Sequence, residues 1–369
     1  MASHVSHIGV HDHGFNNLST YGNLRRLMLE GRIPENEWER HFHELAIKVS
    51  GAVQAARWTE REGGGFIHSF NGPHSLFVDT IRSVRILMLA HRLGHVLMGE
   101  GDRAISLLER SLQHIESTAL FSVFYDEGRD RYDVRGRTAH ECIFNTRDGA
   151  YRCPNSQQGY TGFSTWTRGQ SWATVGFAEE LEFLESMDPA ELEPFGGKAK
   201  WEALMLKAAT ATADNFIENT PTDGISYWDQ GAPNLEKIGD YLNQPADPYN
   251  AWEPVDATAS AITAQGLFRL AEYLKGKGDD EAAGKYEQAG LVTARALLHE
   301  PYLSTKENHQ GLLLHSIYHE PNGWDHRPEA DKAAYGESSM WGDYHLMELG
   351  VYLQRKISGK PFLSFFGPQ

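Results

Sequence analysis

The chain has few cysteines, no long apolar run and no excess of positive charge. Only two of its 369 residues are cysteines, which excludes a framework of several disulfides. Cys142 and Cys153 are either two ordinary thiols or one bridge. No stretch approaches the ~18 consecutive apolar residues of a membrane-spanning helix. The formal net charge of −16, with histidine neutral, argues against nucleic acid or an anionic membrane as a partner.

Targeting and metal-binding signals are also weak. The first residues, MASHVSHIGVHDHGF, lack the basic and apolar regions of a signal peptide, so we expect a cytoplasmic protein. The histidines between residues 4 and 13 resemble a metal-binding tract only weakly, and no zinc-type Cys/His spacing occurs. Hydrophobic residues make up 40% of the chain, which is ample for a packed core.

Helix-length amphipathic segments alternate with polar, glycine-rich loops along the chain. We expect helices over 39–59, 76–98, 102–118, 171–186, 200–219, 256–276, 281–300 and 340–358. Asp256 is the predicted N-cap and Gly276 the predicted stop of one of them. Nothing resembles an interdomain linker, so residues 1–369 are predicted to form one all-α domain. The long loops rich in Trp, His and Asp favour a closed ring of helical hairpins around a funnel over an open solenoid.

Two aspartates, Asp79 and Asp12, occur in unusual sequence contexts. Asp79 lies in the apolar stretch FVDTIRSVRIL, where a carboxyl group is costly unless it is paired or its pKa is raised. A carboxyl group with a raised pKa can act as an acid near neutral pH. The alternative is a surface ion pair with Arg82, three residues later. Asp12 follows His11 in HDHGFNN and is interpreted either as a helix cap or as a carboxylate at the funnel.

The segment TWTRGQSW places Arg168 between Trp166 and Trp172. If a helix begins near residue 165, Arg168 and Trp172 share one of its faces. Arginine can bind a carboxylate through two parallel hydrogen bonds, and indole rings pack on sugar rings. The combination, with Gln158 nearby, favours an acidic sugar as ligand. The alternative is a pair of core tryptophans beside a solvated arginine.

Read together, these segments resemble glycoside hydrolase family 88, the unsaturated glucuronyl hydrolases. The resemblance rests on HDHGF…YGN, FVDTIRSVRIL, QQGY…STWTRGQSWATVGF, PVDATASAITAQGLFRL and MWGDYHLMEL, which follow the family's order between residues 11 and 349. It implies an (alpha/alpha)6 barrel of helical hairpins. The family's first hairpin precedes the His-Asp segment by several tens of residues, whereas only ten residues precede His11 here. We therefore expect that hairpin to be missing or altered.

The resemblance also implies a reaction. Enzymes of this family release a 4,5-unsaturated uronic acid from the nonreducing end of lyase-generated oligosaccharides, by hydrating the C4=C5 vinyl ether without a metal or organic cofactor. By motif, Asp79 and Asp12 are the catalytic residues, and Asp79 protonates C4 and activates the water that reaches C5. The substrate-binding positions implied are His11, His140, Gln158, Trp166, Arg168, Trp172 and His315.

Two alternatives to this function stay open. One is an unsaturated rhamnogalacturonyl hydrolase on the same barrel, with a different neighbouring sugar. The other is a sugar-binding or helical interaction protein that has lost catalysis. The family's Met-Asn after the second catalytic Asp is Arg82-Ser83 here, a departure that bears on substrate preference.

Overall fold

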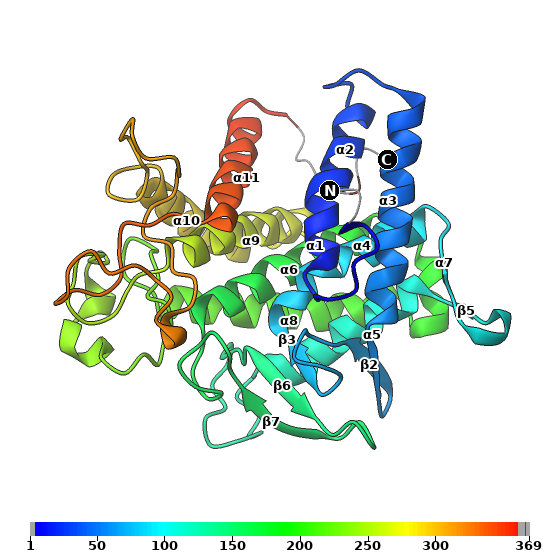
Figure 1. The fold of residues 1–369 in the computed structure, drawn as a ribbon, viewed down its shortest axis with the longest axis horizontal. Coiled ribbons are helices and arrows are strands. Elements are labelled where there is room, and N and C mark those ends of the chain that lie inside the picture. The colour runs from blue at the N-terminus through cyan, green and yellow to red at the C-terminus, as the bar shows by residue number, and fades with distance from the viewer. Residues whose placement is uncertain (1–3, 361–365, 367–369) are drawn as a thin grey trace.

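The computed structural model describes residues 4–360 and Phe366, and helices dominate it (Figure 1). The longer helices are α3 (Glu37–Ala56), α5 (Leu107–Ser117), α6 (Thr167–Glu185), α8 (Lys198–Glu218), α9 (Ala257–Gly276), α10 (Asp280–Leu297) and α11 (Met340–Ile357). The shorter ones are α1 (His13–Asn17), α2 (Asn23–Leu29), α4 (Arg85–Arg92) and α7 (Pro189–Leu192). A π-helical turn, η2 (Leu18–Gly22), joins α1 to α2, another, η5 (Thr118–Ser122), follows α5, and a 3-10 helix, η3 (Val78–Ser83), leads into α4. The predicted helical character is confirmed.

The predicted start and end of the helix over 256–276 are confirmed. The Asp256 carboxylate accepts hydrogen bonds from the amides of Thr258 and Ala259, and α9 ends at Gly276 as predicted. The continuous helix predicted over 76–98 is wrong. Residues 75–77 pair in a sheet, η3 follows, and α4 ends at Arg92 before Gly94, which has a φ of +73°. That left-handed conformation favours glycine and stops the helix.

Short strands form three small antiparallel sheets that the helical pattern did not predict. β1 (Trp58–Arg61) pairs with β2 (Gly64–Ile67), and β4 (Leu97–Met98) pairs with β5 (Ala104–Ile105). The third sheet has the order β3 (Ser75–Phe77), β6 (Glu141–Phe144), β7 (Tyr151–Asn155). Cys142 in β6 is buried and Cys153 in β7 is exposed, and both are free thiols, so the bridge is not formed.

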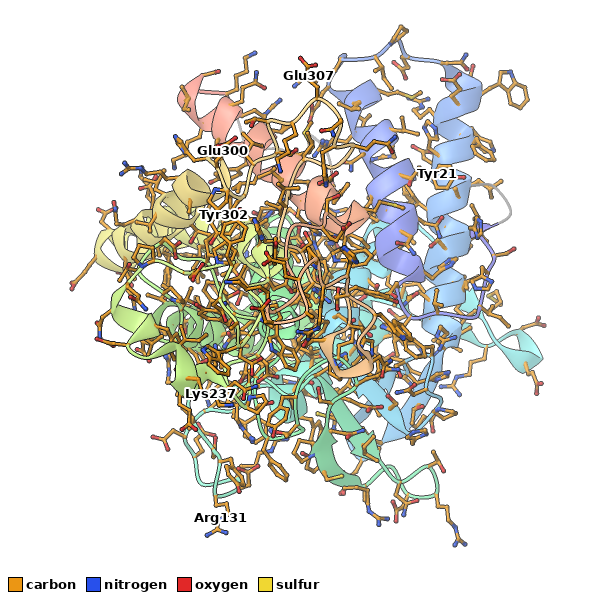
Figure 2. All side chains as sticks on the ribbon, turned by 60° about the vertical axis from the view of Figure 1, so that its left-hand side comes forward. Tyr21, Arg131, Lys237, Glu300, Tyr302 and Glu307 are labelled. Carbon is orange, nitrogen blue, oxygen red and sulfur yellow. The ribbon has the colours of Figure 1, made fainter. Side chains whose placement is uncertain are left out.

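The core is built around two neighbouring helices. α6 packs against α8, α9 and η3, and α9 packs also against α10 and α11. Side chains at the periphery, such as the labelled Arg131 and Glu307, point outward (Figure 2). No helix in the described part of the chain is both long and apolar enough to cross a membrane.

A buried ionic network crosses this core. The Arg82 guanidinium of η3 donates to both carboxylate oxygens of Glu179 on α6, at 3.0 Å each, and to Glu348 of α11 at 3.0 Å. Arg85 also donates to Glu179, at 2.9 Å. Arg82, Arg85 and Glu179 are at most 1% exposed. The network therefore ties four helical elements, η3, α4, α6 and α11, together beside the cavity described next.

Candidate active site

A cavity of about 970 Å³ lies where the start of α1, η3, the start of α6, the 318–324 loop and the start of α11 meet. Its volume is typical of a site for a small-molecule or oligosaccharide ligand. The structure brings most of the predicted site residues to this cavity. Those that line it are His11, Asp12, Asp79, Gln158, Trp166, Arg168 and Trp172. His140 and His315 are not among its lining residues.

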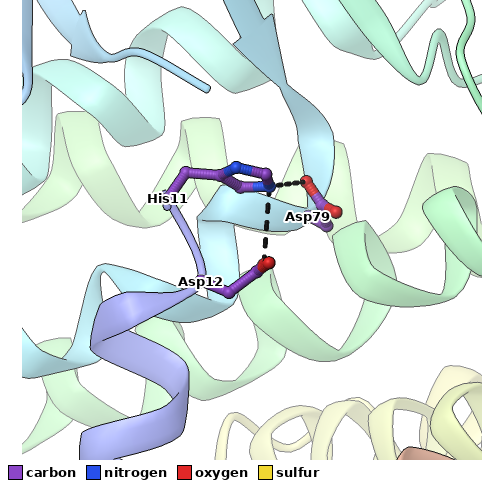
Figure 3. Close-up of side chains that lie close together, drawn as sticks. All are labelled: His11, Asp12 and Asp79. Atoms are coloured by element: carbon purple, nitrogen blue, oxygen red, sulfur yellow. Dashed lines mark ion pairs between the residues drawn. The ribbon is translucent and has the colours of Figure 1, made fainter. Parts of the chain in front are cut away.

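Three of these side chains form an acid–imidazole cluster (Figure 3). His11 Nε2 lies 3.4 Å from Asp12 Oδ1 and 3.3 Å from Asp79 Oδ1. His11 is 1% exposed, Asp79 is 13% exposed and Asp12 is 47% exposed. The imidazole is thus buried behind two carboxylates, of which Asp12 faces the cavity more openly.

The packing of α1 against η3 brings this cluster together. A Cβ at Gly14 would lie 2.4 Å from the carbonyl oxygen of Ser83, so only glycine allows this approach. The Gly14 amide donates to Gln54 Oε1, and Gln54 Nε2 donates to the His11 carbonyl at 2.7 Å. Asp12 occupies the N-cap position of α1, but its side chain makes no capping hydrogen bond. The interpretation of Asp12 as a helix cap is therefore wrong.

The two carboxylates have opposite pKa shifts. Burial raises the pKa of Asp12 and the charge of Asp79 raises it further, against the opposing charge of His11. Burial also raises the pKa of Asp79, but the charge of His11 is the largest of the influences that outweigh burial and hold the pKa below its usual value. Our expectation of a raised pKa at Asp79 is therefore wrong for the protein without ligand, because the sequence did not reveal His11 as its neighbour.

The imidazole carries the proton in this arrangement. Burial lowers the pKa of His11, but the charges of Asp12 and Asp79 outweigh burial and raise it. The ligand atoms of the three residues lie within 4.8 Å of one another, so the set has the composition of a metal site. A doubly protonated imidazole has no lone pair for a metal, so a proton shared at His11 Nε2 and an ion bound there exclude each other.

The alternative pairing of Asp79 with Arg82 is contradicted. Arg82 points into the core and donates to Glu179 and Glu348, as described above, while Asp79 faces His11. Arg82 still lines the base of the cavity, and its guanidinium lies 5.2 Å from the Phe15 ring and 5.8 Å from the Trp172 ring. Arg82, which stands where the resembled family has methionine, thus places a buried cation beside the cavity.

Arg168 is buried, not solvated. Helix α6 begins at Thr167, so Arg168 lies in its first turn with Trp166 at the N-cap position. Its Nη1 donates to Asp256 Oδ2 at 2.5 Å and to the Ile317 carbonyl. Its Nη2 donates to Gln158 Oε1 at 3.1 Å and to the Tyr318 carbonyl at 2.7 Å.

These contacts occupy the four terminal N–H groups of the Arg168 guanidinium, which also lies 4.7 Å from the Trp166 ring. A ligand carboxylate has to replace one of these partners to form two hydrogen bonds with Arg168. Because an arginine only donates, Gln158 must turn Oε1 toward it, which leaves the Gln158 Nε2 free to donate elsewhere. Carboxylate binding by Arg168 stays a prediction.

The two remaining predicted histidines stand behind the cavity wall. His140 Nδ1 accepts from the amides of Gln157 and Gln158, and its ring centroid is 4.5 Å from that of Trp166. Burial lowers its pKa to about 4, so it is neutral and positions the Gln158 backbone. His315 Nδ1 accepts from the Gly336 amide, and its ring packs against Tyr302. The structure thus places His315 away from the cavity.

One side of the cavity is aromatic, and sequence reasoning expected its long loop at the funnel but named none of its residues as site residues. Tyr318, His319 and Trp324 come from one loop, and Trp341 and Tyr344 come from the start of α11. The ring of Tyr318 lies 5.5 Å from Trp324 and 5.2 Å from Trp341. The aromatic composition of this loop was the available signal, but it has no helical period that would assign it a face.

Comparison with known proteins finds distant similarity to unsaturated glucuronyl and unsaturated chondroitin disaccharide hydrolases. No family model matches the chain. It is 28% identical over 232 residues to an unsaturated glucuronyl hydrolase of Bacillus sp. (strain GL1), an alignment that covers 62% of this chain and 50% of that protein. It is 24% identical over 315 residues to an unsaturated chondroitin disaccharide hydrolase of Streptococcus pyogenes serotype M1, covering 83% and 62%. The chain spans about half the length of the first of these relatives.

Solved structures agree over nearly the whole chain. The crystal structure of the Bacillus sp. GL1 unsaturated glucuronyl hydrolase matches with a TM-score of 0.70 at 21% identity, over 98% of this chain and 77% of that chain. An unsaturated glucuronyl hydrolase specific for heparin matches with a TM-score of 0.67 at 18% identity, over 98% and 78%. At these identities the structural likeness shows the fold. The chain is a distant homologue of the unsaturated glucuronyl hydrolases of glycoside hydrolase family 88 and has their fold.

Proposed function

We propose that the protein is a hydrolase that releases a 4,5-unsaturated uronic acid from the nonreducing end of lyase-generated oligosaccharides. The observation that carries the proposal is the cluster of His11, Asp12 and Asp79 inside an aromatic-walled cavity. Two carboxylates with opposite pKa shifts around one imidazolium form a proton reservoir of the kind that acid–base catalysis needs.

The proposed reaction is hydration of the C4=C5 vinyl ether. A proton is added to C4, and the oxygen of a water molecule bonds to C5 while the water gives up a proton. The resulting hemiketal opens, and the bond to the neighbouring sugar is lost. Asp79 carries both proton transfers, because it is the buried carboxylate in contact with His11. Since Asp79 is ionised without ligand, it receives its proton from His11, whose ring also contacts Asp12.

The cavity wall supports an acidic sugar as substrate. Gln158 offers the Nε2 donor, Trp166 and Trp172 offer aromatic surface, and Arg168 provides fixed positive charge. A related structure with a TM-score of 0.70 holds dGlcA-Glc-Rha-Glc, and curated relatives act on unsaturated chondroitin disaccharides by name. No metal or organic cofactor takes part in the proposed reaction.

Turnover of defined unsaturated disaccharides tests the proposal. The ultraviolet absorbance of the C4=C5 bond should disappear with glucuronyl substrates, and a saturated disaccharide should be untouched. In D₂O, deuterium should appear at C4 of the product. Preference for a rhamnogalacturonan-derived disaccharide would move the protein to the alternative hydrolase class. Binding without loss of absorbance would identify a sugar-binding protein, and deuterium absent from C4 would refute hydration.

A further inference from the structure

Asp256 does more than cap a helix. Its Oδ1 accepts hydrogen bonds from the amides of Thr258 and Ala259 at 3.1 Å and 3.3 Å, which caps α9. Its Oδ2 is used differently and lies 2.5 Å from Arg168 Nη1. Asp256 is 0% exposed and does not line the cavity. One buried carboxylate thus joins the start of α9 to the start of α6.

Arg168 extends this connection to the opposite wall. The same guanidinium that contacts Asp256 donates to the carbonyls of Ile317 and Tyr318. Tyr318 lines the cavity, and its ring packs against Trp341 at the start of α11. The Ala257 amide, next in sequence to Asp256, donates to the His315 carbonyl at 3.1 Å. The 315–318 segment is therefore held from two sides at the position of Asp256.

We propose that Asp256 is a positioning residue, which rests on the proposed function: it holds Arg168, and through Arg168 the Tyr318 wall, in the geometry that receives the uronate. The argument is electrostatic. A buried guanidinium without a counter-charge is unstable, and Arg168 is 3% exposed. Without the charge of Asp256, Arg168 has two carbonyls and one amide oxygen as partners, and it turns toward solvent or toward any carboxylate in the cavity.

Asp256→Asn separates positioning from capping. Asparagine is as good an N-cap as aspartate, so the Oδ1 contacts with the α9 amides are kept. The atom facing Arg168 becomes an N–H donor, which places two donors opposite each other. The matched control is Asp279→Asn, because Asp279 caps α10 through the Ala282 amide and contacts no arginine in the structure.

Asp256→Asn should raise KM for the unsaturated disaccharide at least ~10-fold, with kcat changed less than ~3-fold, since Asp256 touches no reacting atom. Hydrogen exchange of the 315–326 segment should accelerate about 10-fold, whereas Asp279→Asn should change neither quantity. An Arg168→Ala, Asp256→Asn double variant should bind no worse than Arg168→Ala alone, because the two residues act as one unit.

The two proposals fail in different ways. If the wild-type protein turns over no unsaturated disaccharide, the function is wrong, and hydrogen exchange still decides the role of Asp256. If the wild-type protein is active and Asp256→Asn keeps its KM and its exchange rates, the positioning role is wrong. Additive losses in the double variant would also overturn it, because they would show that Asp256 and Arg168 act separately.

Discussion

The core network around Glu179 and the cavity cluster of His11, Asp12 and Asp79 both draw on the short segment η3. The two differ in how completely their polar atoms are hydrogen-bonded. In the core network, Glu179 accepts from Arg82 and Arg85 through both oxygens. In the cavity cluster, both ring nitrogens of His11 and Asp79 Oδ1 lack an aligned hydrogen-bond partner within the described residues. A buried carboxylate such as Glu179, whose two oxygens both accept hydrogen bonds, stabilises the fold, whereas unsatisfied polar atoms facing a cavity are available to a ligand.

One short segment supplies both clusters. Asp79 and Arg82 belong to the same 3-10 helix, η3, three residues apart. Because residues three apart lie on the same face of a helix, their spacing in sequence suggested an ion pair. The structure instead directs Asp79 toward His11 and Arg82 toward α6 and α11. The sequence of η3 alone therefore does not show that Arg82 belongs to the core network and Asp79 to the cavity cluster.

The largest effect is expected at the cavity cluster. Asp79→Asn keeps the shape of the side chain but can neither donate nor accept the transferred proton, so kcat should fall by ~10²–10⁴. The melting temperature should fall only modestly, because Asp79 Oδ1 makes no aligned hydrogen bond in the described protein and its stabilisation comes mainly from the charge of His11. Stopped assays of absorbance loss and thermal melts measure the two effects. Normal turnover by Asp79→Asn would remove it from the chemistry.

The core network should show the opposite pattern. Glu179→Gln leaves Arg82, Arg85 and Arg269 facing a neutral amide, and breaking a buried pair in this way typically costs 3–5 kcal/mol of unfolding free energy. Burial raises the pKa of Glu179, but the three arginines hold it below its usual value. Its stabilisation is therefore present above the unfolded pKa and lost as the pH falls through the lower folded pKa.

Glu180 is the matched control for Glu179, because it is the next residue on the same helix and is also buried. Neither of its carboxylate oxygens has a hydrogen-bond partner in the described structure, and burial raises its pKa well above the usual value. Glu180→Gln should be neutral or stabilising at pH 7, since it removes a group that folding must protonate. Denaturant unfolding measures both variants, and equal losses would contradict this contrast.

The pH profile of an Asp12→Asn variant tests how the cavity cluster supplies its proton. The charge of Asp12 is the strongest influence raising the pKa of His11. If His11 supplies the proton, kcat/KM falls as the pH rises through its raised pKa. Asp12→Asn should lower that pKa and move the alkaline limb of the profile to lower pH. A limb that stays in place would separate His11 from the proton supply.

Parts of this molecule could be predicted from local sequence, and others could not. Helices α6, α8, α9, α10 and α11 follow their apolar periodicity, because each buries a continuous face. Asp79 was found because a charge is rare in an apolar stretch, Arg168 because it lies between two tryptophans, and Asp12 because it follows His11. The three-residue contact set, by contrast, depends on α1 packing against η3, and no period in either segment encodes that contact.

The roles of arginines were the hardest to predict. Arg82 and Arg168 were expected on a surface or at a ligand, and both are buried against carboxylates more than eighty residues away in sequence. These carboxylate partners could be identified only from the three-dimensional packing of the helices. The loop that carries Tyr318 and Trp324 was expected at the funnel, but its cavity residues could not be named, because its conformation depends on Asp325, which accepts from the amides of Tyr318 and His319.

The smallest effect is expected at the start of α11, a helix that contributes to both the cavity wall and the core network. Trp341 and Tyr344 of α11 line the cavity, and Glu348 joins the core network. The Ser339 hydroxyl caps the helix by accepting from the Gly342 amide at 3.0 Å. Ser339→Ala should cost about 1 kcal/mol of unfolding free energy, the usual loss of an N-cap. Kinetic constants should stay within ~2-fold of wild type, because Glu348 still anchors the helix to Arg82. A rise in KM comparable to that of Asp256→Asn would instead show that the cap, and not the ionic network, sets the position of the aromatic wall.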